Sequence, residues 1–279
     1  MEKLRRGERI IAMTKKLLDQ PQRLFSLGFF TEFFQVAKST VSEDITIIRQ
    51  ALSRFDMGSI ETFPGAAGGV KYLPHKSTKE ISDFIDEMCQ KLSTPDRILP
   101  GGFIYMADQV FSPFFAKETG EIFATKFSHL KPDYVLTVET KGIPLALMTA
   151  QAFNVPLVII RRDPKVTEGS SVSINYVSGS SKRMQSMTLA KRALPEGAKV
   201  LIIDDFMKAG GTTRGMMDLM VEFEAEVLGI GVLVETAEPK EKVVTDYISM
   251  AVLDKIDERN REIKISPSPW VVSEISDEN

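Results

Sequence analysis

The sequence predicts an α/β fold: a parallel sheet with helices on both faces, preceded by a small helical module that ends in a hairpin. Residues 134–235 alternate short aliphatic runs with longer helical patterns, and such alternation is typical of a parallel sheet covered by helices. Residues 10–55 instead show apolar residues only at helical spacing, followed by two short strand-like runs. The length of 279 residues exceeds that of a usual single domain and favours two.

Composition excludes several classes of protein. A hydrophobic content of 43% and a charged content of 26% are ordinary globular values, so the chain can bury a core. The single cysteine, Cys89, rules out an internal disulfide and favours a reducing compartment. The first nine residues are too polar for a signal peptide, and no apolar run approaches the ~20 residues that span a bilayer. We therefore expect a cytoplasmic protein without a membrane anchor.

The charge is unevenly distributed along the chain. Residues 1–74 hold 11 Lys and Arg against 8 Asp and Glu, which leaves 24 basic and 30 acidic residues of the totals of 35 and 38 for the remainder. A basic segment joined to an acidic body is a recognised hint of nucleic-acid contact. The asymmetry is small and does not decide the matter alone.

Residues 1–74 predict three helices. The first ends before Pro21, because proline disfavours helix in the residue before it, and the second covers residues 26–36. The third carries one apolar stripe, made of Val41, Ile45, Ile48, Leu52 and Phe55, as expected for a helix with one buried face. Thr40 and Glu43, three residues apart, predict a capping box at its start.

The third helix presents polar side chains on its outer face. These are Lys38, Ser39, Thr40, Ser42, Thr46 and Arg49. Short polar and basic side chains near a helix N-terminus suit contacts with phosphates and base edges in a major groove. An ordinary solvated face is the alternative, and this helix alone favours that alternative.

Two predicted strands, at 59–63 and 70–73, follow this helix and are joined by the sequence Pro-Gly-Ala-Ala-Gly-Gly. A helix-turn-helix followed by a glycine-tipped hairpin resembles the winged-helix DNA-binding domain, and the resemblance covers residues 1–74. It implies that Gly68, Gly69 and Lys71 belong to the wing and that Arg5 and Arg6 form a basic arm. Small residues allow such a loop to approach another backbone closely.

Proline and polar residues at 74–78 predict a boundary, so that residues 75–279 form the second domain. Its expected strands lie at 134–139, 155–160, 199–205 and 226–235, and its expected helices include 143–153 and 212–223. Residues 102–106 are expected to be extended, and residues 108–127 to form a helix broken or bent near Pro113.

The segment 200–213 carries the strongest chemical signal. A run of four aliphatic residues ends in Asp204 and Asp205, and small residues then lead into a helix. A helix N-terminus offers unpaired N–H groups and a positive dipole end to a phosphate, while carboxylates accept hydrogen bonds from sugar hydroxyls. The alternative is a strand that happens to end in two acids before a glycine turn.

This segment resembles the phosphoribosyl pyrophosphate (PRPP) motif of type I phosphoribosyltransferases. The resemblance implies that the two aspartates bind ribose hydroxyls and that the loop holds the 5-phosphate. The residues concerned are Asp204, Asp205, Phe206, Met207, Lys208, Ala209, Gly210, Gly211, Thr212 and Thr213. Thr140, Lys141 and Gly142 match the loop that holds pyrophosphate in that family, and residues 165–185 resemble its mobile loop. Magnesium would be carried with PRPP, with few or no direct protein ligands.

Arg161 and Arg162 follow the strand at 155–160. They can supply positive charge to a polyanion beside the pyrophosphate loop, or they can form an ordinary solvated strand end. The sequence supports both interpretations equally. The two histidines, His75 and His129, lie far apart in the sequence and give no zinc motif.

The segment departs from the catalytic pattern at two positions. Lys208 stands where 6-oxopurine transferases have an acid, and a protonated lysine does not accept a proton at neutral pH. Ala209 stands where a Thr or Ser is frequent. As a whole, the chain is similar to the bacterial purine operon repressors of the phosphoribosyltransferase type.

That similarity implies a homodimeric repressor of purine biosynthesis genes that binds operator DNA, senses PRPP as inducer and is not an enzyme. It also implies that guanosine tetraphosphate competes at the same site. Two alternatives stay open: a catalytic purine phosphoribosyltransferase with an accessory N-terminal domain, and a protein-interaction role for residues 1–74.

Overall fold

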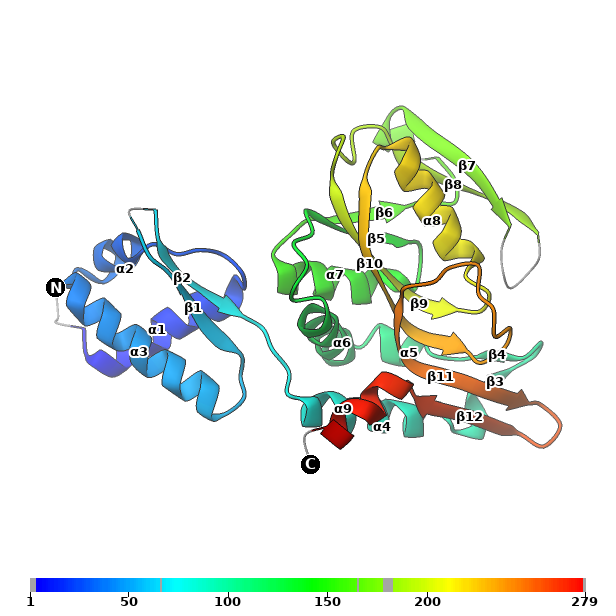
Figure 1. Ribbon diagram of the computed structural model, residues 1–279, viewed down its shortest axis with the longest axis horizontal. Coiled ribbons are helices and arrows are strands. Elements are labelled where there is room, and N and C mark those ends of the chain that lie inside the picture. Colours follow the sequence, from blue (N-terminus) through cyan, green and yellow to red (C-terminus); the bar gives the residue numbers. More distant parts are fainter. Residues whose placement is uncertain (1–3, 66, 165, 178–182, 278–279) are drawn as a thin grey trace. The chain divides into compact units, whose positions relative to one another are not determined.

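The computed structural model describes residues 4–65, 67–164, 166–177 and 183–277. The chain divides into two compact units, one consisting chiefly of Met1–Ser77 and the other chiefly of Thr78–Ala150 and Val155–Asn279. Figure 1 shows the elements of each unit. Among the described residues, no helix combines the length and the apolar character needed to cross a membrane.

The first unit contains the predicted helices and hairpin. It comprises α1 (Arg6–Asp19), α2 (Leu27–Phe34), α3 (Lys38–Arg54), β1 (Ser59–Phe63) and β2 (Gly69–Leu73). The strands pair antiparallel. The predicted stripe of α3 is largely buried, together with Met13, Leu17 and Phe30 from the other helices, so burial of one face of each helix holds this unit together.

The helix caps differ from the prediction. The N-cap of α3 is Ala37, without a side-chain hydrogen bond, so the capping box expected from Thr40 and Glu43 is wrong: Thr40 already lies inside the first turn. Side-chain hydrogen bonds occur instead at the earlier helices. The Ser26 hydroxyl accepts from the Phe29 N–H at the start of α2, and the Glu8 carboxylate accepts from the Arg5 N–H at the start of α1.

The second unit is built on a six-stranded sheet with the order β12-β11-β10-β9-β5-β6 among its described residues. Its strands are β5 (Tyr134–Val138), β6 (Leu157–Ile160), β9 (Lys199–Met207), β10 (Glu226–Thr236), β11 (Ile248–Asp257) and β12 (Glu262–Pro267). Neighbouring strands are parallel except β11 and β12, which are antiparallel.

Helices cover both faces of this sheet. They are α4 (Thr78–Leu92), α5 (Ala107–Val110), α6 (Pro113–Lys126), α7 (Gly142–Phe153), α8 (Gly211–Glu222) and α9 (Pro269–Asp277). Ile202 packs with Met216 and Leu219 of α8. The side chains of Ile203 and of Phe123 in α6 instead both lie next to Gly231. Because successive strand residues point to opposite faces, α8 and α6 lie on opposite sides. The predicted fold class is confirmed.

Residues 165–185, which resemble the mobile loop of phosphoribosyltransferases, contain regular strands in part of their length. The chain forms an antiparallel ribbon there, made of β7 (Ser171–Val177) and β8 (Met184–Ala190), while residues 165 and 178–182 lie outside the described residues. Tyr176, Met187 and Leu189 bury one side of the ribbon in the core that it shares with α8. Frequent serines hide this alternation in the sequence.

Further elements were not predicted. They are β3 (Ile98–Leu99), β11, β12 and α9, whereas β4 (Phe103–Ile104), which pairs with β3, lies in the stretch 102–106 that was expected to be extended. The expected break at Pro113 is confirmed, since α5 ends at Val110 and α6 begins at Pro113. Strand β9 continues to Met207, so both aspartates lie within the strand rather than at its end.

Candidate functional site

A cavity of about 350 Å³ opens at the carboxyl ends of β5, β6 and β9. Its lining residues are Val138, Glu139, Thr140, Lys141, Arg162, Asp204, Asp205, Phe206 and Thr212. The three segments that the sequence marked as candidate sites therefore meet in one place. This is where open α/β sheets bind ligands, since the strands end there and the loops that follow converge.

The two carboxylates of the cavity differ in exposure. Asp204 is 4% exposed, and its carboxylate accepts a hydrogen bond from the Asp205 N–H at 2.9 Å. Burial and the neighbouring Asp205 raise the pKa of Asp204 well above its ordinary value. Burial also raises the pKa of Asp205, and the ammonium of Lys141 opposes that rise. The cavity thus holds two acids that are costly to ionise until donors or cations reach them.

Gly142 allows α7 to begin directly against Asp204. A Cβ at this position would lie 2.4 Å from Thr137 Oγ1 and 3.1 Å from Asp204 Oδ1. A larger residue therefore has no room. Gly142, which was predicted to bind pyrophosphate, therefore allows close packing that places the N-terminus of α7 at the cavity.

The loop 206–213 surrounds a hollow of about 60 Å³. Gly210, with φ +81°, is the N-cap of α8, a conformation that glycine adopts without strain. Thr213 is buried and Thr212 is partly exposed. The shape and the free N–H groups of a helix start suit one phosphate.

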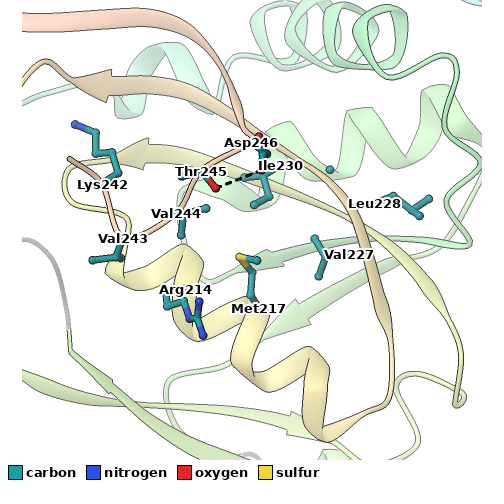
Figure 2. A pocket seen from close by; sticks show the side chains of 11 residues that line it. Arg214, Met217, Val227, Leu228, Ile230, Lys242, Val243, Val244, Thr245 and Asp246 are labelled. Carbon is teal, nitrogen blue, oxygen red and sulfur yellow. Dashed lines mark hydrogen bonds between the residues drawn. The ribbon is translucent and has the colours of Figure 1, made fainter. Parts of the chain in front are cut away.

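The segment 236–246 supports this loop from outside. The Val243 N–H donates to the Ala209 carbonyl at 3.0 Å, and the Thr236 hydroxyl donates to the Lys208 carbonyl at 3.2 Å. A second cavity, of about 320 Å³, lies between α8, β10 and residues 242–246 and includes Arg214, Met217 and Asp246 in its lining (Figure 2).

The two arginines after β6 have different positions. Arg162 lines the 350 Å³ cavity. Arg161 forms ion pairs with Glu139 at 3.3 Å and Glu168 at 3.2 Å and lines a separate hollow beside β6. The backbone N–H of Arg162 also donates to Glu139, at 2.8 Å. The structure therefore brings Arg162 into the predicted site and places Arg161 outside it.

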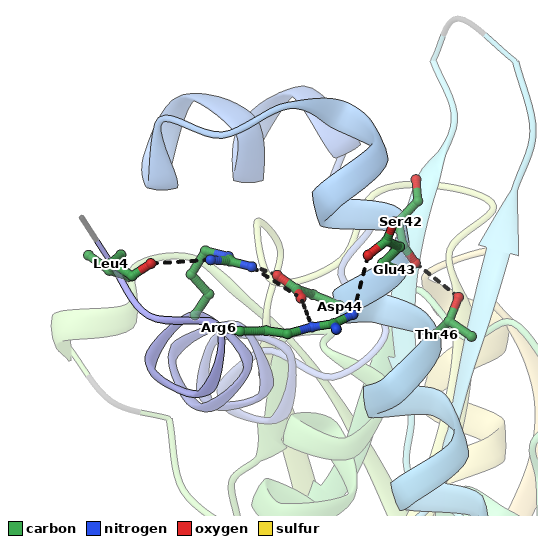
Figure 3. A network of polar contacts seen from close by, with 7 residues as sticks. Leu4, Arg6, Ser42, Glu43, Asp44 and Thr46 are labelled. Atoms are coloured by element: carbon green, nitrogen blue, oxygen red, sulfur yellow. Dashed lines mark hydrogen bonds and ion pairs between the residues drawn. The ribbon is translucent and has the colours of Figure 1, made fainter.

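Of the two residues of the predicted basic arm, Arg5 is the extended N-cap of α1 and Arg6 belongs to the helix. Arg6 is the first residue of α1, and its guanidinium pairs with Glu43 at 3.3 Å and with Asp44 at 3.2 Å. Arg9 binds the other oxygen of Asp44 at 2.9 Å, and the Asp44 side chain is 0% exposed. Figure 3 shows this network between α1 and α3. Arg6 thus fixes helix packing, which an extended arm would not do.

The outer face of α3 remains available for a partner. Lys38, Ser39, Ser42 and Thr46 are exposed on it, and the hydroxyls of Ser42 and Thr46 donate to the carbonyls of Lys38 and Ser42. These short side chains leave a smooth helical surface with one lysine at its start. Such a surface fits a major groove.

The remaining residues predicted to bind DNA also have structural partners. Arg49 Nε donates to the Ile60 carbonyl at 3.2 Å, and Lys71 pairs with Glu61 at 3.3 Å. A Cβ at Gly69 would lie 2.2 Å from the Phe25 carbonyl oxygen, and one at Gly68 would lie 2.2 Å from the Phe63 carbonyl oxygen. The glycines therefore allow close packing of the hairpin, and Gly69 lies in β2 rather than at the tip.

Two family models match the chain. Residues 5–74 match the N-terminal domain of the bacterial purine repressor, and residues 106–265 match the phosphoribosyl transferase domain. The purine biosynthesis transcriptional repressor of Bacillus subtilis (strain 168) is 50% identical over 94% of this chain and 92% of its own length. The chain belongs to the bacterial purine repressor family.

Other members of the purine repressor family match over a similar length. A probable purine biosynthesis transcriptional regulator of Streptococcus pneumoniae is 44% identical over 94% of this chain and 96% of its own. A xanthine phosphoribosyltransferase of Geobacillus thermodenitrificans is 33% identical but covers only 54% of this chain, with 80% of its own length matched. The family assignment confirms the prediction of a transcriptional regulator of purine biosynthesis and not an enzyme.

The solved structures show the fold of the second unit. Adenine phosphoribosyltransferase from Thermoanaerobacter pseudethanolicus covers 60% of this chain and 98% of its own, with a TM-score of 0.51 and 21% identity. The enzyme from Saccharomyces cerevisiae has a TM-score of 0.52 at 20% identity and covers 60% of this chain and 98% of its own. At these identities the likeness concerns the fold alone.

Proposed function

We propose that this member of the purine repressor family binds operator DNA through its first unit and is released when PRPP occupies the 350 Å³ cavity. One observation carries the proposal: the paired aspartates, the loop with Lys141, the side chain of Arg162 and the N-terminus of α8 converge in that cavity. The same chain also has the purine repressor N-terminal domain. As a gene regulator it acts in the cytoplasm, where the bacterial chromosome lies.

Each part of PRPP has a complementary group in the site. The loop before α8 offers N–H groups and the Thr212 hydroxyl to the 5-phosphate. Asp205, with Asp204 behind it, accepts hydrogen bonds from the ribose hydroxyls. Lys141 and Arg162 bind the pyrophosphate as charged donors. The positive charge of the magnesium that accompanies the ligand also lowers the free-energy cost of ionising the two aspartates.

Magnesium fits this site as a companion of PRPP. Among the described residues, no cluster of three or more His, Cys, Asp or Glu side chains could hold a metal ion. Mg²⁺ keeps much of its water and commonly reaches proteins through substrate phosphates and one or two carboxylates. Asp204 and Asp205 are the carboxylates at hand. Guanosine tetraphosphate also combines phosphates with a ribose, and we propose that it competes for the cavity and favours repression.

On the DNA side, the outer face of α3 enters the major groove. Arg5, Lys38 and the hairpin are the groups expected to contact phosphates or bases. A homodimer would present two such units to a two-fold symmetric operator, as is common among helix-turn-helix proteins. For PRPP to release DNA, it must bind the DNA-free state more tightly than the DNA-bound state, since a ligand with equal affinity shifts nothing.

The test uses a fluorescent duplex that carries the control region of a purine biosynthesis operon from the same genome. We expect PRPP with Mg²⁺ to lower the affinity of the wild type for this duplex at least tenfold. The Asp204→Ala/Asp205→Ala double variant should bind DNA normally but no longer respond to PRPP. Asp218→Ala, a change at a half-exposed residue of α8, should respond like the wild type. A double variant that PRPP still releases would contradict the site assignment.

A further inference from the structure

The guanidinium of Arg162 is held by the β7–β8 ribbon. Arg162 Nη1 donates to Gln185 Oε1 at 3.2 Å, and the Tyr176 hydroxyl donates to the same oxygen at 2.7 Å. Tyr176 and Gln185 are cross-strand partners in the ribbon. One amide oxygen therefore joins a tyrosine of β7 to the arginine of the cavity.

Tyr176 in turn packs against α8, the helix that follows the loop 206–213. Its side chain is 6% exposed, and a Cβ at Gly215 of α8 would lie 2.9 Å from its Cγ. The ribbon runs along α8 in Figure 1, in agreement with the contacts between β7 and this helix. The close approach at Gly215 leaves the ring little freedom, so the position of its hydroxyl is set by the core.

Arg162 itself lies on the surface. Residue 162 is exposed, and its backbone is anchored through the bond from its N–H to Glu139. A free arginine side chain would lose rotamer entropy when it becomes ordered on a ligand. The bond to Gln185 orders the side chain in advance and uses a single N–H donor, which leaves others for phosphate oxygens.

We propose that Tyr176 and Gln185 are positioning residues that hold Arg162 ready for the pyrophosphate end of the effector. The ribbon then raises the affinity of the cavity for a ligand that carries pyrophosphate. It does not raise the affinity for a ligand with the 5-phosphate alone, because that phosphate binds at the loop before α8. This inference rests on the proposed function, because it assigns a role within the same site.

The experiment compares two ligands by calorimetry on the full chain: PRPP with Mg²⁺, and ribose 5-phosphate. Tyr176→Phe keeps the buried ring and removes only the hydroxyl. We expect it to weaken PRPP binding about threefold to tenfold, the usual effect of one hydrogen bond, and to leave ribose 5-phosphate binding unchanged. Gln185→Ala should behave in the same way. Ser186→Ala, an exposed neighbour on β8, is the matched control and should bind both ligands like the wild type.

A double-mutant cycle separates positioning from a merely structural role. In an Arg162→Ala background, Tyr176→Phe should have no further effect on PRPP affinity. An equal loss for both ligands, or a loss that persists without Arg162, would overturn the inference. Normal PRPP binding by both ribbon variants would overturn it while leaving the proposed function intact. A wild type that binds no PRPP at all would instead refute the proposed function, and this inference with it.

Discussion

At the scale of single residues, the cavity contains a buried acid, Asp204, whose ionised form is disfavoured by its surroundings. Asp204 is buried beside Asp205, and its pKa is raised by that burial and by its neighbour. Groups with perturbed pKa values in a cleft are typical of functional sites. A residue that costs stability yet completes a binding cavity is best explained by its ligand.

Replacing Asp204 by asparagine should therefore stabilise the second unit. The pKa of Asp204 is higher in the folded than in the unfolded chain, so the folded state favours the protonated carboxyl. This preference stabilises the fold fully below the unfolded-state pKa, and the stabilisation is lost as pH rises through the folded-state pKa. We expect Asp204→Asn to raise the free energy of unfolding by about 1 to 2 kcal/mol at pH 7, with a smaller gain at pH 5, and to weaken PRPP binding. Denaturant unfolding followed by the fluorescence of Trp270, the single tryptophan, measures this. A destabilised variant at pH 7 would contradict the interpretation.

The Asp44 network gives a second prediction at this scale. Arg9→Ala leaves a fully buried carboxylate with the half-exposed Arg6 as its remaining ion-pair partner, and breaking a buried pair typically costs about 3 to 5 kcal/mol. Arg6→Ala should cost about 1 kcal/mol or less, since Arg9 still binds Asp44. Hydrogen exchange of the α3 amides measures both. Equal protection in the two variants would show that burial of Arg9 does not matter.

At the scale of elements, the sequence predicted what short-range patterns determine. The stripe of α3, the aliphatic strand before Asp204 and the glycine turn into α8 each leave a local signature. The β7–β8 ribbon was missed because polar residues such as Ser173, Asn175 and Ser186 are interspersed along it, and because the burial of Tyr176 depends on packing against α8. Arg162 rather than Arg161 lines the cavity because Arg161 pairs with Glu139 and Glu168. No local sequence pattern reveals that these two glutamates lie close to Arg161.

Gly142 tests how closely α7 must approach β9. Alanine at this position would overlap Thr137 Oγ1, and overpacking of this kind costs about 1 to 3 kcal/mol. We expect Gly142→Ala to lower the stability of the second unit by that amount and to weaken PRPP binding more than tenfold. The control is Gly7→Ala in α1, where a Cβ meets nothing within 4 Å and helix propensity predicts a gain of up to about 1 kcal/mol. A Gly142→Ala variant with unchanged stability and binding would refute the packing role.

At the scale of the whole molecule, a basic first unit is joined to an acidic second unit that has a transferase fold. Composition alone showed the charge difference but not where DNA would bind, since Arg6, Arg49 and Lys71 are held by partners within the unit. The resemblance of residues 1–74 and of the segment 200–213 to known families identified the pair of modules, and the comparisons agree with it.

DNA affinity should depend on salt through the first unit only. Each phosphate contact contributes about 0.9 to the slope of log affinity against log salt concentration. Lys38→Ala should reduce that slope by about this amount. Lys264→Ala, which changes an exposed side chain of β12, should leave the slope unchanged. A salt-independent affinity in the wild type would favour a protein partner for residues 1–74.

The central claim, that occupation of the cavity and DNA binding oppose each other, is tested most directly by measuring both affinities in one set of conditions. PRPP with Mg²⁺ should weaken operator binding, and saturating operator DNA should weaken PRPP binding by the same factor, because coupling between two sites is reciprocal. Equal PRPP affinities of the free and DNA-bound chain would contradict the claim.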